Sequence, residues 1–376
     1  MKVLHVTRTY YPDPPGGIQE AIRQICISTK QFGVENTIFT LSPTPFPSVL
    51  HRPEGTVIRC RSWAAPASCD LGTWESIQTF RRLVAQSDVV HYLFPWPFAD
   101  VLRECAPAKP SVLTYISDIV RQKWLGAAYE PLMLRTLRSM DAIVFNAPQY
   151  AAGSMVLNRN ELRKKLFQIP LGIAELPGLS DDFVDDSIFE KIGLKKDEPY
   201  ILFVGVHRYY KGLSFLLDAA LQTNGKIIIA GSGPLEEFLR DLAKRLNLSN
   251  VIFSGEVTDA EKRALLKACR ALILPSHLRS EAYGMVLIEA SINSKPMITC
   301  DIGTGTSYVN LHNQTGLVVA PADPAQLSGA MNLLLSNADL ALKYGAAARL
   351  RYEQQFSGHA LGQSYAHLFS KLAGQH

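Results

Sequence analysis

Short apolar runs recur along the chain, and a polar or amphipathic segment of helical length separates most of them from the next. In the first half the runs that read as strands are Lys2–Thr7, Asn36–Leu41, Val57–Arg61, Val89–Phe94, Ser111–Ile116 and Ala142–Asn146. Buried parallel strands are near-continuous apolar runs, and the alternation with helices is typical of βαβ units. The pattern therefore predicts a parallel sheet covered by helices on both faces.

The alternation stops near residues 167–178, where an apolar run leads into Pro177-Gly178 and an acidic segment, and then it starts again. The second set of predicted strands is Tyr200–Val204, Lys226–Ala230, Val251–Phe253, Ala271–Leu274 and Pro296–Cys300, with Gly316–Val319 near the sheet edge. We predict an α/β protein of two doubly wound, Rossmann-like domains, 1–172 and 173–356, facing each other across a cleft. Ligands of such sheets bind outside the carboxyl ends of the strands.

Length and composition agree with two soluble domains. A chain of 376 residues exceeds one ordinary core, and 47% hydrophobic with 19% charged residues is typical of globular proteins. The sequence has no apolar run of roughly 18 residues, the length that would span a membrane, and it does not begin like a secretory signal. Its six cysteines form no CxxC pair, which favours reduced thiols and a cytoplasmic protein. We read the acidic segment Asp181–Asp186 as a linker, not a metal site.

Charge is unevenly distributed along the chain. Residues 1–170 contain 19 Lys and Arg against 13 Asp and Glu, a net +6, while the remainder contains 19 against 21, a net −2. All four tryptophans, Trp63, Trp74, Trp96 and Trp124, lie in the first half. Such a half could approach an anionic membrane surface or a lipid-diphosphate acceptor. Ordinary surface charge and core aromatics would explain the same distribution, and we expect no nucleic-acid partner.

The most informative motif is a pair of glutamates, Glu281 and Glu289, on either side of Gly284. If residues 284–295 form a helix, its start offers unpaired N–H groups that suit a phosphate. Glu281 then lies just before the helix, and Glu289 lies roughly 12 Å further along it. Because two carboxylates so far apart cannot hold one atom, the spacing points to an extended ligand with a diphosphate in its middle, such as a nucleotide-sugar.

In each predicted domain, a glycine-containing loop follows the first strand. Gly16-Gly17 would let the backbone approach a phosphate closely, although a simple flexible loop would look the same. In the loop after Val204, Arg208 and Lys211 could neutralise a diphosphate, where the alternative is a pair of solvated cations.

Two other features have plainer explanations. The turn at 231–234 lacks the third glycine of a dinucleotide fingerprint, and Pro234 reads as a helix N1 residue, so we do not expect NAD. His91, inside an apolar strand, reads as a buried, hydrogen-bonded histidine.

Together these motifs resemble a known family. Glu281-x7-Glu289, the Lys-Gly that ends the segment Val204–Gly212, Gly16-Gly17 and Thr315–Val318 look like retaining glycosyltransferases of family 4, which have the GT-B fold. The segments Tyr209–Gly212 and Ser117–Lys123 look closer still to bacterial O-antigen mannosyltransferases that use GDP-mannose. The resemblance implies that 173–356 binds the nucleotide-sugar, that 1–172 is the acceptor side, and that a helix from about Ser357 to 376 crosses back onto it.

Site roles follow from the resemblance by position. Glu281 would contact the hydroxyls of the donor sugar, Glu289 the ribose, and Arg208 and Lys211 the diphosphate. The other donor-binding residues would be Gly16, Gly17, Tyr283, Gly284, Met285 and Val286, with Glu256 and Val257 near the base. No metal or other cofactor is implied, because cationic side chains and a helix end replace it. Since Val206 and His207 separate Arg208 from its usual place beside the glycine, Lys211 is the firmer assignment.

This chain departs from the family in what would be the donor-sugar pocket, formed by His91, Leu93, Ile116 and Asp118. Where the family commonly has His-x-His, the sequence reads His91-Tyr92-Leu93, and Ile116 stands where relatives often have histidine. In the family the histidine matching Leu93 bonds the donor's 6-hydroxyl. Because an unused polar group is costly to bury, leucine there suits a 6-deoxy sugar.

We therefore expect GDP-D-rhamnose as donor and an undecaprenyl-diphosphate-linked saccharide as acceptor, in synthesis of a lipopolysaccharide common antigen. The enzyme would be cytoplasmic or peripheral at the inner face of the cytoplasmic membrane. GDP-mannose with an apolar pocket is the nearest alternative. From other classes, a non-catalytic nucleotide-sugar-binding subunit of a polysaccharide assembly complex, or an epimerase or phosphorylase of the same architecture, stays open.

Overall fold

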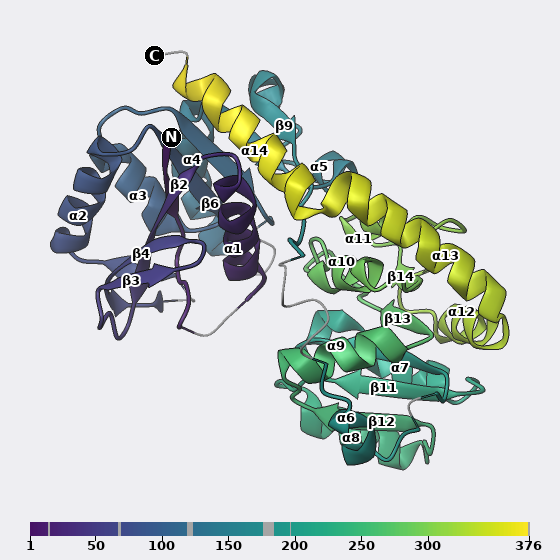
Figure 1. The fold of residues 1–376 in the computed structure, drawn as a ribbon. Helices are drawn as coiled ribbons and strands as arrows, with labels where there is room; N and C mark the ends of the chain where they lie inside the picture. The colour runs from purple at the N-terminus through teal and green to yellow at the C-terminus, as the bar shows by residue number, and fades with distance from the viewer. Residues whose placement is uncertain (14–15, 67–68, 119–122, 176–183, 196, 375–376) are drawn as a thin grey trace. The chain divides into compact units, whose positions relative to one another are not determined.

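The computed structural model describes residues 1–13, 16–66, 69–118, 123–175, 184–195 and 197–374. These form two compact units, which Figure 1 draws in ribbon form. Unit 1 comprises Met1–Ala174 and Ser357–His376, and unit 2 comprises Glu175–Phe356. Within the described residues, no helix has both the length and the apolar character needed to cross a bilayer. The division falls two residues after the expected boundary at 172.

Unit 1 is built on a nine-stranded sheet in the order β3-β4-β2-β1-β6-β7-β8-β9, with β5 paired to β4. Its strands are β1 (Lys2–Val6), β2 (Glu35–Ser42), β3 (Val49–Arg52), β4 (Gly55–Ala64), β5 (Leu71–Gly72), β6 (Val89–Phe94), β7 (Ser111–Tyr115), β8 (Ala142–Phe145) and β9 (Leu166–Gln168). All neighbours are parallel except β3 and β5, which run antiparallel to β4. The parallel strands end at one edge of the sheet.

The helices of unit 1 cover this sheet. They are α1 (Gly17–Lys30), α2 (Trp74–Ala85), α3 (Pro97–Cys105), α4 (Lys123–Ser139), α5 (Pro148–Ala152), the 3-10 helix η2 (Asn160–Lys165) and α14 (Gly358–Ala373). The final helix α14 lies beside α1, and Leu361, Tyr365 and Phe369 pack into the core formed by the strands (Figure 1). The C-terminal segment is thus part of unit 1 although it follows unit 2 in sequence.

Unit 2 has a six-stranded parallel sheet in the order β12-β11-β10-β13-β14-β15, the arrangement of a dinucleotide-binding fold. Its strands are β10 (Tyr200–Val204), β11 (Lys226–Ala230), β12 (Val251–Gly255), β13 (Ala271–Leu274), β14 (Met297–Cys300) and β15 (Gly316–Val319). Its helices are α6 (Ser187–Lys191), η3 (Tyr209–Lys211), α7 (Leu213–Ala220), α8 (Glu236–Arg245), α9 (Asp259–Ala268), α10 (Met285–Ile292), α11 (Thr306–Val309), α12 (Pro324–Ser336), α13 (Ala338–Arg351) and the π-helix η4 (Tyr352–Phe356).

The predicted strands are confirmed in both units, including β15 at a sheet edge. The antiparallel strands β3 and β5 were missed, because they are short and only half-buried. The prediction that Pro234 is a helix N1 residue is wrong: α8 begins at Glu236, and Pro234 belongs to the turn before it. The helix predicted over 284–295 ends sooner, at Ile292, since Ser294 adopts a positive φ of 53° that a helix cannot continue.

Close backbone contact between α1 and α14 requires a glycine. A Cβ on Gly362 would lie 2.1 Å from the carbonyl oxygen of Ser28, which is far inside van der Waals contact. By contrast, a Cβ on Gly329 of α12 would meet nothing within 4 Å in the described part of the chain. Helix packing therefore requires glycine at position 362 but not at position 329.

We expect Gly362→Ala to lower the free energy of unfolding by about 1–3 kcal/mol, because the added methyl forces α14 away from α1. Gly329→Ala is the matched control and should raise it by roughly 0.5–1 kcal/mol through helix propensity. Thermal unfolding followed by circular dichroism distinguishes the two, and equal shifts of both variants would contradict this account of the packing.

Candidate active site

Two loops of unit 2 are pressed together at the carboxyl ends of the neighbouring strands β10 and β13. Gly212, which follows η3, has a φ of 70°, and a Cβ there would lie 2.0 Å from the carbonyl oxygen of Pro275. The backbone N–H of His277 donates to the carbonyl oxygen of Tyr210 at 3.0 Å. Only glycine permits both the left-handed turn and the contact. The Lys-Gly motif thus fixes the position of Lys211 against the loop that follows β13.

Lys211 and Glu281 form an ion pair across these two loops, Nζ to Oε2. The Ser276 hydroxyl donates to the same carboxylate oxygen at 3.1 Å. The side chains of Lys211 and Glu281 are only 12% and 10% exposed. Because so little water reaches them, each charge depends on the other for its stabilisation. The sequence predicted both charged residues but not their pairing, and it gave no signal for Ser276.

The start of α10 lies just after this pair. Gly284, its N-cap, has a φ of 82°, and a Cβ there would lie 2.7 Å from Cδ2 of Leu274. Among the described residues no side chain caps the helix, so the amides at Gly284, Met285 and Val286 have no side-chain acceptor at its positive end, where an anion is favoured. Tyr283 is 6% exposed and packs on Gly305, so its ring belongs to the core of unit 2.

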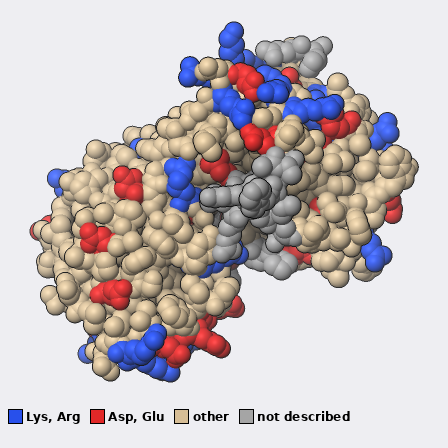
Figure 2. Space-filling view, turned by 180° about the vertical axis from the view of Figure 1, so that it is seen from behind, with Lys and Arg blue, Asp and Glu red and all other residues tan. Residues whose placement is uncertain are grey.

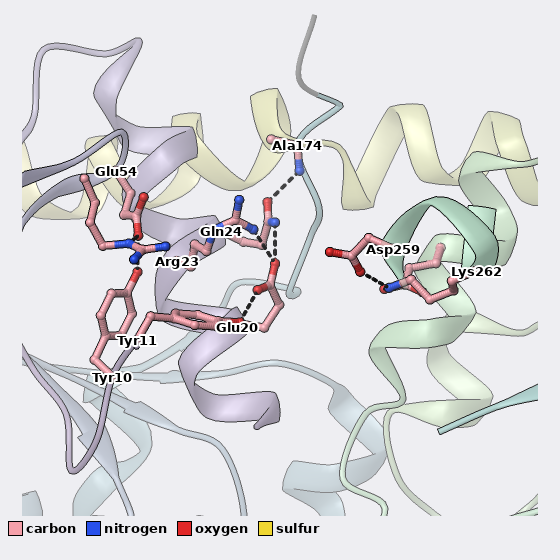
Figure 3. A network of polar contacts seen from close by, with 11 residues as sticks. Tyr10, Tyr11, Glu20, Arg23, Gln24, Glu54, Ala174, Asp259 and Lys262 are labelled. Atoms are coloured by element: carbon pink, nitrogen blue, oxygen red, sulfur yellow. Dashed lines mark hydrogen bonds and ion pairs between the residues drawn. The ribbon is translucent and has the colours of Figure 1, made fainter. Parts of the chain in front are cut away.

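Glu289 faces α9 from within α10. Its Oε1 lies 3.1 Å from Nζ of Lys262, which also lies 3.5 Å from Oδ1 of Asp259, and Figure 3 shows Lys262 turned toward Asp259. Burial lowers the pKa of Lys262, but the two carboxylates more than offset it and raise the pKa above its usual value. Glu289 is therefore a partly exposed carboxylate already held by a cation, and the sequence had not pointed to Lys262.

The remaining predicted residues of unit 2 lie on the surrounding loops. Arg208 is exposed at the N-cap of η3, one turn before Lys211. Glu256, after β12, is exposed and accepts a hydrogen bond from the Ser232 hydroxyl, and Val257 beside it is half-buried. His207 is fully buried, and neither of its ring nitrogens has a hydrogen-bond partner within the described part of the chain. Burial lowers its pKa, which keeps the ring neutral.

In unit 1 the predicted glycine loop meets the start of α1. Gly16 is the N-cap, in extended backbone, and no described side chain caps the helix. A Cβ on Gly17 would meet none of the described residues within 4 Å, so the backbone there is open to a close approach. Further along the helix, the Tyr11 hydroxyl donates to Glu20, and the Gln24 side-chain oxygen accepts from the amide of Ala174 (Figure 3).

His91 lies in a chain of hydrogen bonds inside unit 1, as the favoured interpretation predicted. Its Nδ1 is 3.0 Å from Nδ1 of His5, and its Nε2 is 2.7 Å from the Thr114 hydroxyl, which is 2.8 Å from that of Tyr365 in α14. His5 Nε2 completes the chain at 2.9 Å from Oδ1 of Asn36.

The rings of His5 and His91 are both neutral in this hydrogen-bond network. Burial lowers the pKa of His5 to about 4, partly offset by its bond to Asn36, and burial together with His5 lowers that of His91 well below 6.5. With one proton on each ring, every bond in the chain has one donor and one acceptor. His91 has no exposed surface, and its place in a donor-sugar pocket stays a prediction.

The other three pocket residues lie near the carboxyl ends of β6 and β7. Leu93 pairs in register with Thr114, and Ile116 comes two residues later, so Leu93 and Ile116 share one face. Leu93 is 3% exposed and packs in a core cluster with Tyr10, whereas Ile116 is half-buried. Asp118 accepts hydrogen bonds from the hydroxyls of Tyr115 and Ser154 and so braces this edge. Residues 119–122 of the resemblance segment lie outside the described residues.

Two family matches and a shared fold define the class of protein, a glycosyltransferase. Residues 184–351 match the "Glycosyl transferases group 1" family, and residues 16–158 match the "Glycosyl transferase 4-like domain". The chain superimposes on sucrose-phosphate synthase from Thermosynechococcus elongatus with a TM-score of 0.79 at 21% identity over the whole of both chains, which shows a shared GT-B fold.

Two relatives match over nearly the full length. The chain is 42% identical to the D-rhamnosyltransferase WbpZ of Pseudomonas aeruginosa, over 95% of this chain and 92% of the relative. It is 38% identical to the O-antigen chain mannosyltransferase C of Escherichia coli, over 99% of both. The chain therefore belongs to the group 1 glycosyltransferases, as its resemblance to family 4 predicted.

The Lys211–Glu281 pair gives a stability prediction. Glu281→Ala should lower the free energy of unfolding by up to about 3 kcal/mol, because it leaves Lys211 charged and without its carboxylate in a shielded site. Lys211→Met combined with Glu281→Leu should cost less, since no charge is stranded.

Glu289→Gln is the matched control, because the pair of Glu289 with Lys262 is more exposed, and it should cost about 1 kcal/mol or less. Urea unfolding followed by circular dichroism measures all three variants. A double variant less stable than Glu281→Ala would show that the charge imbalance is not the cause.

Proposed function

We propose that the protein transfers D-rhamnose from GDP-D-rhamnose to a lipid-linked saccharide, with retention and without a metal ion, in synthesis of a lipopolysaccharide O-antigen. The observation that carries the proposal is the 42% identity, over nearly the whole chain, to a relative named D-rhamnosyltransferase. The proposed donor also suits the apolar pair of Leu93 and Ile116, which offers a 6-hydroxyl no hydrogen-bond partner.

In unit 2 we assign each charged group to the part of the donor that its charge suits. The amides at the start of α10 and the ammonium group of Lys211 hold the diphosphate, whose negative charge grows as the glycosyl bond breaks. Glu281 positions the donor sugar and keeps the ammonium group of Lys211 in place. Glu289 accepts from the ribose, and Glu256 and Val257 border the base. Arg208, exposed on the same loop as Lys211, adds positive charge near the diphosphate.

In unit 1, Gly16 and Gly17 leave room for the diphosphate next to backbone amides. We also propose that the enzyme acts in the cytoplasm at the inner face of the cytoplasmic membrane, where an undecaprenyl-diphosphate-linked acceptor is accessible. The leaving diphosphate can itself take the acceptor's proton, so the proposed reaction needs no separate base among the side chains.

The donor is tested by giving purified protein GDP-D-rhamnose or GDP-mannose with the same lipid-linked acceptor. We expect kcat/KM to favour GDP-D-rhamnose, because mannose must bury its 6-hydroxyl against Leu93 and Ile116 without a partner. Leu93→His should shift the ratio toward GDP-mannose by about tenfold, and Leu93→Met is the control of similar volume. A clear preference of the wild type for GDP-mannose would replace D-rhamnose with the runner-up donor.

Catalysis itself is tested with Glu281→Ala. Transfer should be abolished, while binding of GDP, measured by calorimetry, falls much less, because the diphosphate contacts at α10 remain. Wild-type turnover by this variant would reject the role of Glu281. Absence of both transfer and donor hydrolysis in the wild type would instead favour the non-catalytic, nucleotide-sugar-binding subunit.

A further inference from the structure

Large aromatic side chains stand exposed around the end of β4, at the side of unit 1 where β3 forms the sheet edge. Phe46, in the connection between β2 and β3, is 91% exposed, and Trp63, near the end of β4, is 65% exposed. Val49, the first residue of β3, is 46% exposed. Soluble domains rarely leave several aromatic side chains so bare in one place unless they bind something.

The loop that carries Phe46 is held in place by a buried cation. Arg59 of β4, whose side chain is 2% exposed, donates to the carbonyl oxygens of Thr44, Phe46 and Pro47 at 2.9, 3.2 and 3.3 Å. The same guanidinium bonds to the hydroxyl of Ser42 at 2.8 Å and pairs with Asp13 at 3.3 Å. The exposure of Phe46 is therefore a fixed feature of the fold, since its backbone is tied to β4.

Trp63 lies close to this loop along the same strand. Arg61 pairs in register with Ser42, where the loop begins, and Trp63 follows two residues later at a bulge between Ser62 and Ala64. Bulges turn side chains away from the regular alternation. A third exposed tryptophan, Trp74, is 66% exposed at the start of α2, shortly after the β5 segment that pairs with Ser62. Phe46, Trp63 and Trp74, which we call the aromatic edge, thus surround the end of β4.

This edge has little negative charge. Glu54 is the only acidic residue between 41 and 69, and it is 2% exposed, with its carboxylate bonded to the Tyr10 hydroxyl and the Arg52 guanidinium. Glu75, beside Trp74, is exposed. Arg61 is exposed. On the face drawn in Figure 2, basic and acidic residues lie together in small groups, so the excess charge of the first 170 residues is not one basic field there. The aromatic edge therefore offers mainly apolar contact, with the exposed cation Arg61 beside it.

We propose that the aromatic edge docks on an anionic lipid bilayer, with Phe46, Trp63 and Trp74 in the boundary between head groups and acyl chains. Tryptophan is enriched at this depth, and phenylalanine, which has no polar group, gains most from an apolar phase. Arg61 adds attraction to lipid phosphates. The inference rests on the proposed function in one respect, that the acceptor is lipid-linked: the aromatic edge lies where β2 and β4 end, the same sheet edge as Gly16 and Gly17.

The test uses the full chain and vesicles of phosphatidylethanolamine and phosphatidylglycerol, with neither donor nor acceptor present. Wild-type protein should cosediment with them, and Phe46→Ser combined with Trp63→Ser should weaken binding by about 100-fold, roughly tenfold for each aromatic removed. Phe238→Ser, on α8 of unit 2, removes another exposed phenylalanine and should change nothing. Brominated lipids should quench tryptophan fluorescence, and Trp63→Phe should reduce that quenching.

Transfer to a short, water-soluble acceptor separates this proposal from its rivals. The double variant should keep wild-type kcat and KM there, which also shows that it folds. Two results would overturn the inference: vesicle binding by the double variant equal to the wild type, or a raised KM for the soluble acceptor with unchanged vesicle binding, which would make the aromatic edge a saccharide platform. The vesicle test uses no donor. Its result therefore decides the membrane inference even if the donor proves to be GDP-mannose.

Discussion

The ion pair between Lys211 and Glu281 is the interaction on which the site in unit 2 depends. It forms because Gly212 lets the loop after β10 touch the backbone at Pro275, which brings an ammonium group to a carboxylate 70 positions later in the chain. Charges so little exposed must be balanced, since the cost of desolvation is offset only by a close partner. The pair therefore ties together two strand ends and places a positive charge next to the uncapped start of α10.

Unit 1 is organised by buried polar contacts of a different kind. The chain through His5, His91 and Thr114 ends on Tyr365, so a helix that follows unit 2 in sequence is bonded to the centre of the first sheet. At the sheet's carboxyl edge, Arg59 and Asp13 join the loops after β1 and β2. The histidine network holds the C-terminal helix on the sheet, and the Arg59–Asp13 pair holds the two loops at the carboxyl edge.

Secondary structure was predictable because it is encoded locally. Buried parallel strands such as Val89–Phe94 show their character within six neighbouring residues, and the glycine between Glu281 and Glu289 marks a helix start in the same window. The failures are also local in origin. Pro234 was placed by a preference for position N1, but the turn through Gly233 delays the helix. The strands β3 and β5 carry a weak apolar pattern, since they lie at an edge and bury little.

By itself the sequence determined two Rossmann-like domains, the glycine loops and the charged residues Lys211, Glu281 and Glu289, because periodicity and motif spacing are properties of short windows. Tertiary structure alone decided which groups meet: Lys211 with Glu281, Lys262 with Glu289, Arg59 with Asp13, and Tyr365 with Thr114. It also decided that Phe46 and Trp63 are exposed to solvent. These outcomes depend on strand order and on close backbone contact between distant segments, which no local pattern of residues contains.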